Sequence, residues 1–137
     1  MDGLIKITPN KEKARSILKM VEINLERIQL TDQKKFVSNI VKDYYDVIRE
    51  LISIILLLDG FKSVGEEAHK KLIEYFGENY KYLESSEIIL IDELRVLRNK
   101  ITYDGFFVGQ DFLERNIGTI KDTINKLKLA VDNKLKG

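Results

Sequence analysis

The sequence predicts an all-α protein, an antiparallel bundle of four or five helices that forms a single domain over residues 1–137. Two observations indicate this class. Apolar residues recur every three or four positions along most of the chain, which is the period of an amphipathic helix. Proline, which breaks helices, occurs once, at Pro9, so long helices are allowed. A chain of 137 residues is also long enough to bury a core of its own.

The first helix is predicted to begin at Thr8-Pro9 and to end near residue 29. Threonine is a common N-cap, and proline fits the first helical position because its missing N–H would have no partner there. The preceding residues, 1–7, indicate a short extended arm or a fragment of strand. The apolar positions of the helix fall on one face: Ala14, Ile17, Leu18, Val21, Leu25 and Ile28.

Thr31 and Asp32 are expected to cap a second helix that ends near Leu58, where Gly60 supplies a left-handed stop. From Val47 onward this helix is apolar on nearly all sides. Such a helix lies either at the centre of a bundle or against another subunit. We expect a homodimer, because five residues of this half provide more apolar surface than one core needs: Ile48, Leu51, Ile52, Ile55 and Leu56.

The third helix is predicted to be short, at about residues 66–75, because residues 63–66 match a capping box. Gly77 should end it, and Tyr80, Tyr82 and Leu83 should pack as a linker.

The fourth and fifth helices complete the predicted bundle. The fourth begins at Ser85, stops at Gly105 and has an apolar stripe at Leu90, Leu94, Leu97 and Ile101. Phe106 and Phe107 are expected to plug one end of the bundle. The fifth, at about residues 111–133, has a seam with alternating steps of four and three: Leu113, Ile117, Ile120, Ile124, Leu127 and Val131. Its lysines, at 121, 126, 128, 134 and 136, should form a solvated face.

Composition excludes several classes of function. The chain has no cysteine, which excludes disulfides, cysteine-based zinc sites and thiol catalysis. One histidine, His69, excludes a multi-histidine metal site within one chain, and we expect neither metal nor cofactor. A formal charge of +1 argues against a dedicated DNA-binding protein, although a local patch could contact RNA. Residues 51–58, the longest apolar run, are too few to span a membrane, which takes about 20. The N-terminus lacks the pattern of a secretory signal, so a cytoplasmic protein is expected.

Polar side chains are locally concentrated at the end of the predicted fourth helix. The candidate site residues there are Arg95, Arg98, Asn99, Tyr103 and Asp104, with Lys100 beside them. Arginine is well suited to holding phosphate groups, and tyrosine can stack on a base. Positions 98 and 103 point about 140° apart on an ideal helix. Their side chains therefore converge only if the helix loosens or a second subunit contributes one of them.

The Arg98-Asn99 pair at the end of the fourth helix, together with the order of the helices, resembles the HEPN superfamily over residues 8–134. This resemblance implies a small helical bundle that forms a homodimer in which two copies of the motif face one cleft. It also implies a nucleotidyltransferase-type protein as a possible partner. Active members of the superfamily are metal-independent ribonucleases, often toxins of toxin–antitoxin pairs. Their motif is an arginine, commonly followed by asparagine, and then a histidine four to six residues further along.

This chain departs from that motif, because Tyr103 occupies the commonest histidine position. Tyrosine has an ordinary pKa of about 10, so it is a poor base for a 2′-hydroxyl at neutral pH. We therefore predict that this protein has lost catalysis and acts as a binding module for a nucleotide, RNA or a protein partner. Two alternatives stay open. One is a ribonuclease with an altered motif. The other is a structural role in which Arg98 pairs with Asp92, Glu93 or an acid on the partner subunit, and Tyr103 closes the end of the core.

Three further residues are weighed for function. His69 is expected on the solvated surface, and it could supply the missing base only if the fold brought it beside Arg98. Tyr44 and Tyr45 are expected to be core or interface aromatics, because they lie in the second helix before its apolar half.

Overall fold

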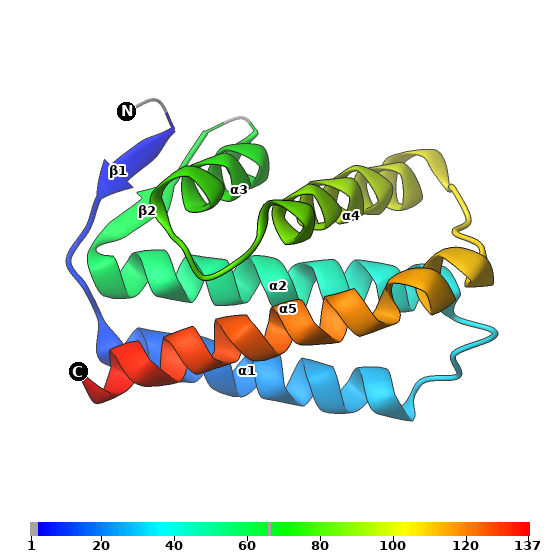
Figure 1. Ribbon diagram of the computed structural model, residues 1–137, viewed down its shortest axis with the longest axis horizontal. Helices are drawn as coiled ribbons and strands as arrows, with labels where there is room; N and C mark the ends of the chain where they lie inside the picture. Colours follow the sequence, from blue (N-terminus) through cyan, green and yellow to red (C-terminus); the bar gives the residue numbers. More distant parts are fainter. Residues whose placement is uncertain (1–2, 66) are drawn as a thin grey trace.

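The computed structural model describes residues 3–65 and 67–137, and over these residues the protein is an all-α bundle, as predicted (Figure 1). Its elements are β1 (Leu4–Lys6), α1 (Lys11–Leu30), α2 (Val37–Asp59), β2 (Phe61–Ser63), α3 (Ala68–Asn79), α4 (Ser85–Asp104) and α5 (Gln110–Lys136). None of the helices in this part of the chain combines the length and the apolar character needed to cross a bilayer.

Helix α2 lies at the centre of the bundle, with α1 and α5 on one side of it and α3 and α4 on the other (Figure 1). The apolar half of α2 is therefore covered within a single chain. Ile48, Leu51, Ile52, Ile55 and Leu56 are each at most 1% exposed. The expectation that these five residues leave surplus apolar surface for a dimer is wrong, because other elements of the same chain already cover them.

The first two helices begin later than predicted, because Asn10 caps α1 and Asp32 caps a separate turn that precedes α2. The amide oxygen of Asn10 accepts the backbone N–H of Lys13 at 3.0 Å, so Asn10, and not Thr8, is the N-cap of α1. Thr31 is the C-cap of α1. Asp32 accepts the N–H groups of the next turn, and α2 starts only at Val37. The predicted stop at Gly60 is confirmed, with φ at 87°.

A two-stranded antiparallel sheet, β1 with β2, precedes α3. Of the two possibilities for the N-terminal residues, an extended arm or a fragment of strand, the structure has the strand, β1. Its partner β2 follows α2 directly, and Leu4 pairs with Ser63. Ser63 therefore belongs to a strand and does not cap a helix. The proposed capping box ends at residue 66, which lies outside the described residues. Helix α3 starts at Ala68.

Gly77 does not end α3, which continues to Asn79. A Cβ at Gly77 would lie 3.2 Å from the side chain of Ile88, so glycine here permits the close approach of α3 and α4. After α3, Tyr80 stacks on Phe76 with 5.0 Å between ring centroids, which confirms that this segment packs as a linker.

Helix α4 has the predicted bounds. Its first turn is held by a reciprocal capping box between Glu84 and Glu87, and Gly105 ends it with φ at 65°. Leu90 and Leu94 are buried, and Leu97 and Ile101 pack half-buried against the core.

Phe106 and Phe107 do not plug the bundle. Phe107 is 86% exposed and Phe106 is also exposed, whereas Val108 is buried. The backbone N–H of Val108 donates to the hydroxyl of Ser38 at 2.9 Å, which anchors this turn to α2 and leaves both phenylalanines outside.

Helix α5 is a little longer than predicted, and its seam is buried apart from Ile117, which is half-buried. Two of its lysines are not simply part of a solvated face. The ammonium group of Lys134 donates to Asp59 at 2.8 Å, and that of Lys126 donates to Glu87 at 2.9 Å. These pairs connect α5 to the end of α2 and to α4.

The carboxylate of Glu87 should make stability depend on pH. Burial alone would raise its pKa, but the N–H of Glu84, the ammonium of Lys126 and the hydroxyl of Thr123 together hold the pKa below its ordinary value. A lowered pKa in the folded state contributes stability above the unfolded pKa, and this contribution is lost as the pH falls through the folded value. We expect the free energy of unfolding to decrease on acidification below about pH 4.5. In chemical denaturation of Glu87→Gln, the free energy of unfolding should depend less on pH in the acid range than it does in the parent. An unchanged dependence on pH would contradict this assignment.

Candidate functional site

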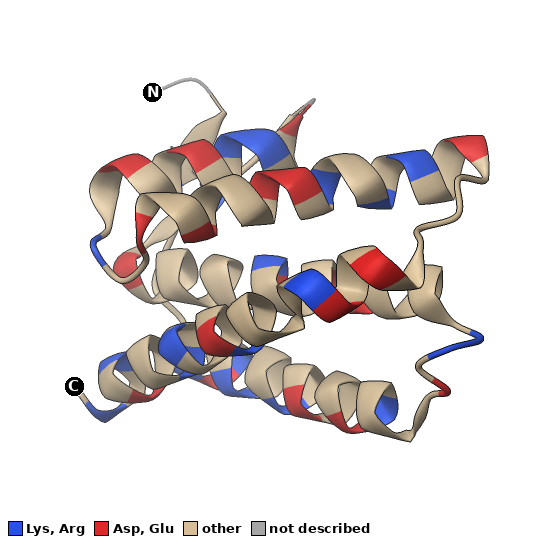
Figure 2. Ribbon diagram, turned by 45° about the vertical axis from the view of Figure 1, so that its right-hand side comes forward, with Lys and Arg blue, Asp and Glu red and all other residues tan. Residues whose placement is uncertain are grey.

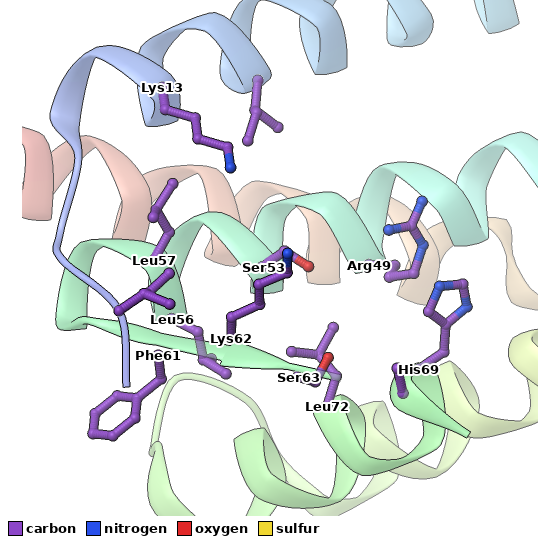
Figure 3. Close-up of a pocket in the computed structure, with 13 residues that line it drawn as sticks. Lys13, Arg49, Ser53, Leu56, Leu57, Phe61, Lys62, Ser63, His69 and Leu72 are labelled. Carbon is purple, nitrogen blue, oxygen red and sulfur yellow. The ribbon is translucent and has the colours of Figure 1, made fainter. Parts of the chain in front are cut away.

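Polar side chains from three helices meet where α2, α3 and α4 come together, and we call this group the polar cluster. It consists of Tyr45, Asp46 and Arg49 from α2, His69 from α3, and Arg95 and Arg98 from α4. The charges of Arg49, Arg98, Asp46 and Arg95 all act on the imidazole of His69. The rings of Tyr45 and His69 are 6.1 Å apart, and Figure 3 shows the side chains of Arg49 and His69 next to each other.

Helical spacing explains how the chain builds the cluster. Asp46 and Arg49 are one turn apart on α2, and Arg95 and Arg98 are one turn apart on α4, so each pair lies on one side of its helix. The basic residues of α4 occupy its second half, after the acidic turn at Asp92 (Figure 2). His69 lies in the first turn of α3.

The three arginines of the cluster differ in how their charge is balanced. Arg95 donates to Asp92 at 2.8 Å. Arg49 lies 3.9 Å from Asp46 and 3.7 Å from Glu50. Among the described residues no carboxylate pairs with Arg98.

Arg98 instead donates to the side-chain oxygen of its neighbour Asn99, at 3.4 Å. The structural interpretation in which Arg98 pairs with Asp92 is therefore wrong, because Arg95 already occupies that carboxylate. Nor does Glu93 pair with Arg98.

Four buried polar atoms of the cluster have no hydrogen-bond partner within the described protein. They are the hydroxyl of Tyr45, Oδ1 of Asp46, Nε of Arg49 and Nε of Arg98. Buried polar atoms without partners are uncommon in folded proteins. Four of them in one place distinguish this junction from the rest of the core, and two of them are cationic donors.

The surroundings also keep His69 neutral. Burial lowers the pKa of His69, and the positive charges of Arg49 and Arg98 lower it further. Burial raises the pKa of Tyr45 to about 12, so its hydroxyl stays protonated. At neutral pH the cluster therefore offers a neutral imidazole, a hydroxyl and three guanidinium groups, beside the carboxylate of Asp46.

The sequence-predicted site residues separate into two groups. Arg95, Arg98 and Asn99 are half-buried on the side of α4 that faces α2 and α3. Tyr103 and Asp104 lie in the last turn of α4, and Tyr103 is 74% exposed. Tyr103 therefore does not close the end of the core, and that expectation is wrong. Lys100 is exposed beside the ring of Phe106.

His69 was expected on the solvated surface, but it is half-buried beside Tyr45 and Arg49. Tyr44 and Tyr45 are confirmed as core aromatics, at 5% and 0% exposure.

Asp46 and Arg49 were missed as site residues. The signal that could have revealed them is a set of charged residues, Asp46, Arg49 and Glu50, at the start of the apolar half of the helix. Among the described residues, no group of three or more histidine, aspartate or glutamate side chains could hold a metal ion.

Comparison of the chain with protein-family models, with curated proteins and with solved structures finds no match.

Proposed function

We propose that this protein is a HEPN-like homodimeric module that binds a phosphate-bearing ligand, RNA or a nucleotide, at the polar cluster. The observation that carries the proposal is the state of Arg98. Its side chain is half-buried, its Nε has no partner, and no described carboxylate forms an ion pair with it.

A partly desolvated guanidinium needs a compensating anion, and a phosphate group matches its planar fork of donors. Arg49 and Arg95 lie in the same cluster, so a ligand phosphate at Arg98 would meet further positive charge. Arg49 is the more available of these two, because its carboxylates are 3.7 and 3.9 Å away, beyond hydrogen-bond distance.

Fluorescence anisotropy with a short labelled single-stranded RNA, in buffer containing EDTA, tests the proposal. We expect saturable binding that weakens steeply as the salt concentration rises, because phosphate contacts release counterions. AMP as a competitor distinguishes a nucleotide site from one that requires a chain of phosphates. An absence of saturable binding to both RNA and AMP at low salt would contradict the proposal.

A second candidate function is metal-independent RNA cleavage, and the position of His69 favours it. The fold brings this histidine beside Arg49 and within the influence of Arg98, although it lies outside the sequence motif. A neutral imidazole could accept the 2′-hydroxyl proton while an arginine stabilises the phosphorane charge. Attack of that oxygen on phosphorus would expel the 5′-oxygen, which takes a proton from water, and leave a 2′,3′-cyclic phosphate.

His69→Gln should then abolish RNA cleavage measured in EDTA, whereas Tyr103→Phe should leave it unchanged. Because the pKa of His69 is lowered, the cleavage rate should rise with pH, and the midpoint of that rise should lie below about pH 6.5, the ordinary histidine value. Cleavage that survives His69→Gln would exclude this histidine as the base.

The proposed homodimer needs a surface other than α2, and α4 offers one. Ile89, Val96 and Tyr103 are exposed and follow each other at intervals of seven residues, so they form a stripe along the outer side of α4. Phe106 and Phe107, also exposed, extend this stripe beyond the helix. A dimer formed through this stripe would cover Tyr103 and bring the two copies of α4 together.

Ile89→Glu should convert the dimer to a monomer in light scattering at micromolar concentration, because it buries a charge in the interface. Ile23→Glu on α1 is the matched control, since Ile23 is exposed outside the stripe, and it should stay dimeric. A monomeric parent protein would refute the dimer.

The nucleotidyltransferase-type partner also remains part of the proposal, and co-purification after coexpression with such an enzyme tests it.

A further inference from the structure

A cleft of about 240 Å³ opens between α1, α2, β2 and α3, on the far side of Arg49 and His69 from α4 (Figure 3). Its polar lining comes from four elements: Lys13 on α1, Arg49 and Ser53 on α2, Lys62 and Ser63 on β2, and His69 on α3. Arg98 and Arg95 do not line it. The cleft is therefore a separate space that shares only Arg49 and His69 with the polar cluster.

The charge of this lining has one sign. Three cations and an imidazole line the cleft, and none of the described residues that line it carries a carboxylate. In the described part of the chain, neither Lys13 nor Lys62 forms an ion pair. Figure 3 shows these two lysines reaching into the cleft from opposite sides, Lys13 from α1 and Lys62 from β2. Such convergence of positive charge around a concave surface concentrates anions.

The remaining walls are apolar, and they include Ile17, Leu57 and Leu72. Ligand pockets usually have volumes of about 300–1,000 Å³. This cleft, at about 240 Å³, is slightly smaller and therefore suits a small molecule. A ligand that matches both parts of the lining has one strongly anionic group and a compact apolar body.

We propose that this cleft binds a small phosphate monoester, with its phosphate held by Lys13, Lys62 and Arg49 and its organic group against the apolar walls. A phosphate monoester is close to a dianion at neutral pH, which matches several cations better than a carboxylate does. Arg49 adds a further cation to the lining, and its own carboxylate neighbours lie 3.7 and 3.9 Å away, beyond hydrogen-bond distance. Ser53 and Ser63 supply hydroxyl donors for the remaining phosphate oxygens.

Isothermal titration calorimetry with phenyl phosphate as the probe tests this site. We expect saturable binding that is tighter than that of inorganic phosphate, which lacks the apolar body, and tighter than that of benzoate, which has one negative charge. Lys62→Gln and Lys13→Gln should each weaken phenyl phosphate about tenfold or more, because charge-assisted hydrogen bonds are the strong ones. Both lysines are exposed, so these variants should fold, and thermal melts verify it.

Lys6→Gln is the matched control. Lys6 is an exposed lysine on β1, the strand paired with β2, and it does not line the cleft. This variant removes the same charge and should bind phenyl phosphate as the parent does. Lack of saturation by phenyl phosphate, equal weakening by Lys6→Gln and Lys62→Gln, or benzoate binding as tight as that of phenyl phosphate would each overturn the proposal. Lys62→Gln should leave RNA binding in the anisotropy assay unchanged, because Lys62 lies outside the polar cluster, so failure of the RNA site and failure of this site give different results.

Discussion

Leu94→Ala is expected to lower the free energy of unfolding by about 2–5 kcal/mol, because it leaves a cavity in the centre of the bundle. Leu94 is 0% exposed and belongs to the core between α4 and α2. The measurement is a urea or guanidinium melt of the variant and the parent.

Leu97→Ala is the matched control for this prediction. It makes the same chemical change one turn later on α4, at a residue that is only half-buried. Its cost should be clearly smaller, since solvent and neighbouring side chains can occupy part of the space. Equal costs at the two positions, or a loss under about 1 kcal/mol for Leu94→Ala, would mean that the core face of α4 is wrongly assigned.

Arg98→Ala should weaken RNA binding at least about 30-fold, because losing one partner of a buried charge pair costs about 2–5 kcal/mol of binding free energy. The same variant should leave the free energy of unfolding within about 1 kcal/mol of the parent, since no described carboxylate pairs with Arg98 and none is left stranded. Anisotropy and a denaturant melt on one preparation measure both quantities.

A structural role for Arg98 predicts the opposite pattern, with intact binding and a loss of about 3–5 kcal/mol in folding. Arg115→Ala is the matched control for binding. Arg115 is exposed on α5, away from the polar cluster, and its Nε donates only to a backbone oxygen of its own helix. If Arg115→Ala weakened RNA binding as much as Arg98→Ala, the effect would be one of overall charge.

The helices could be predicted from the sequence wherever local chemistry decides them. The bounds of α4 were right, because a polar turn precedes Ser85 and Gly105 adopts the left-handed conformation that ends a helix. The predicted start of α2 is wrong, because Asp32 caps a separate turn. A capping residue in the sequence looks the same whether it begins a single turn or a long helix. The prediction that Gly77 ends α3 is wrong, because this glycine instead allows α4 to approach α3 closely, which the local sequence does not reveal.

The candidate site was only partly predictable for the same reason. Arg95, Arg98 and Asn99 are neighbours on one helix, so the sequence alone brings them together. Asp46 and His69 join them only through the packing of α2 and α3 against α4, which helical periodicity does not determine. The angle of about 140° between positions 98 and 103 did anticipate that Tyr103 lies apart from Arg98.

The most direct test of the central claim is an NMR titration of the isotopically labelled protein with a short single-stranded RNA. It maps which backbone amides and arginine Nε–H groups change as the ligand binds. The proposed site predicts that the largest changes fall on Arg49, His69, Arg95 and Arg98, at the junction of α2, α3 and α4. Changes confined to the exposed lysines of α5, such as Lys121, with the polar cluster unaffected, would contradict the account.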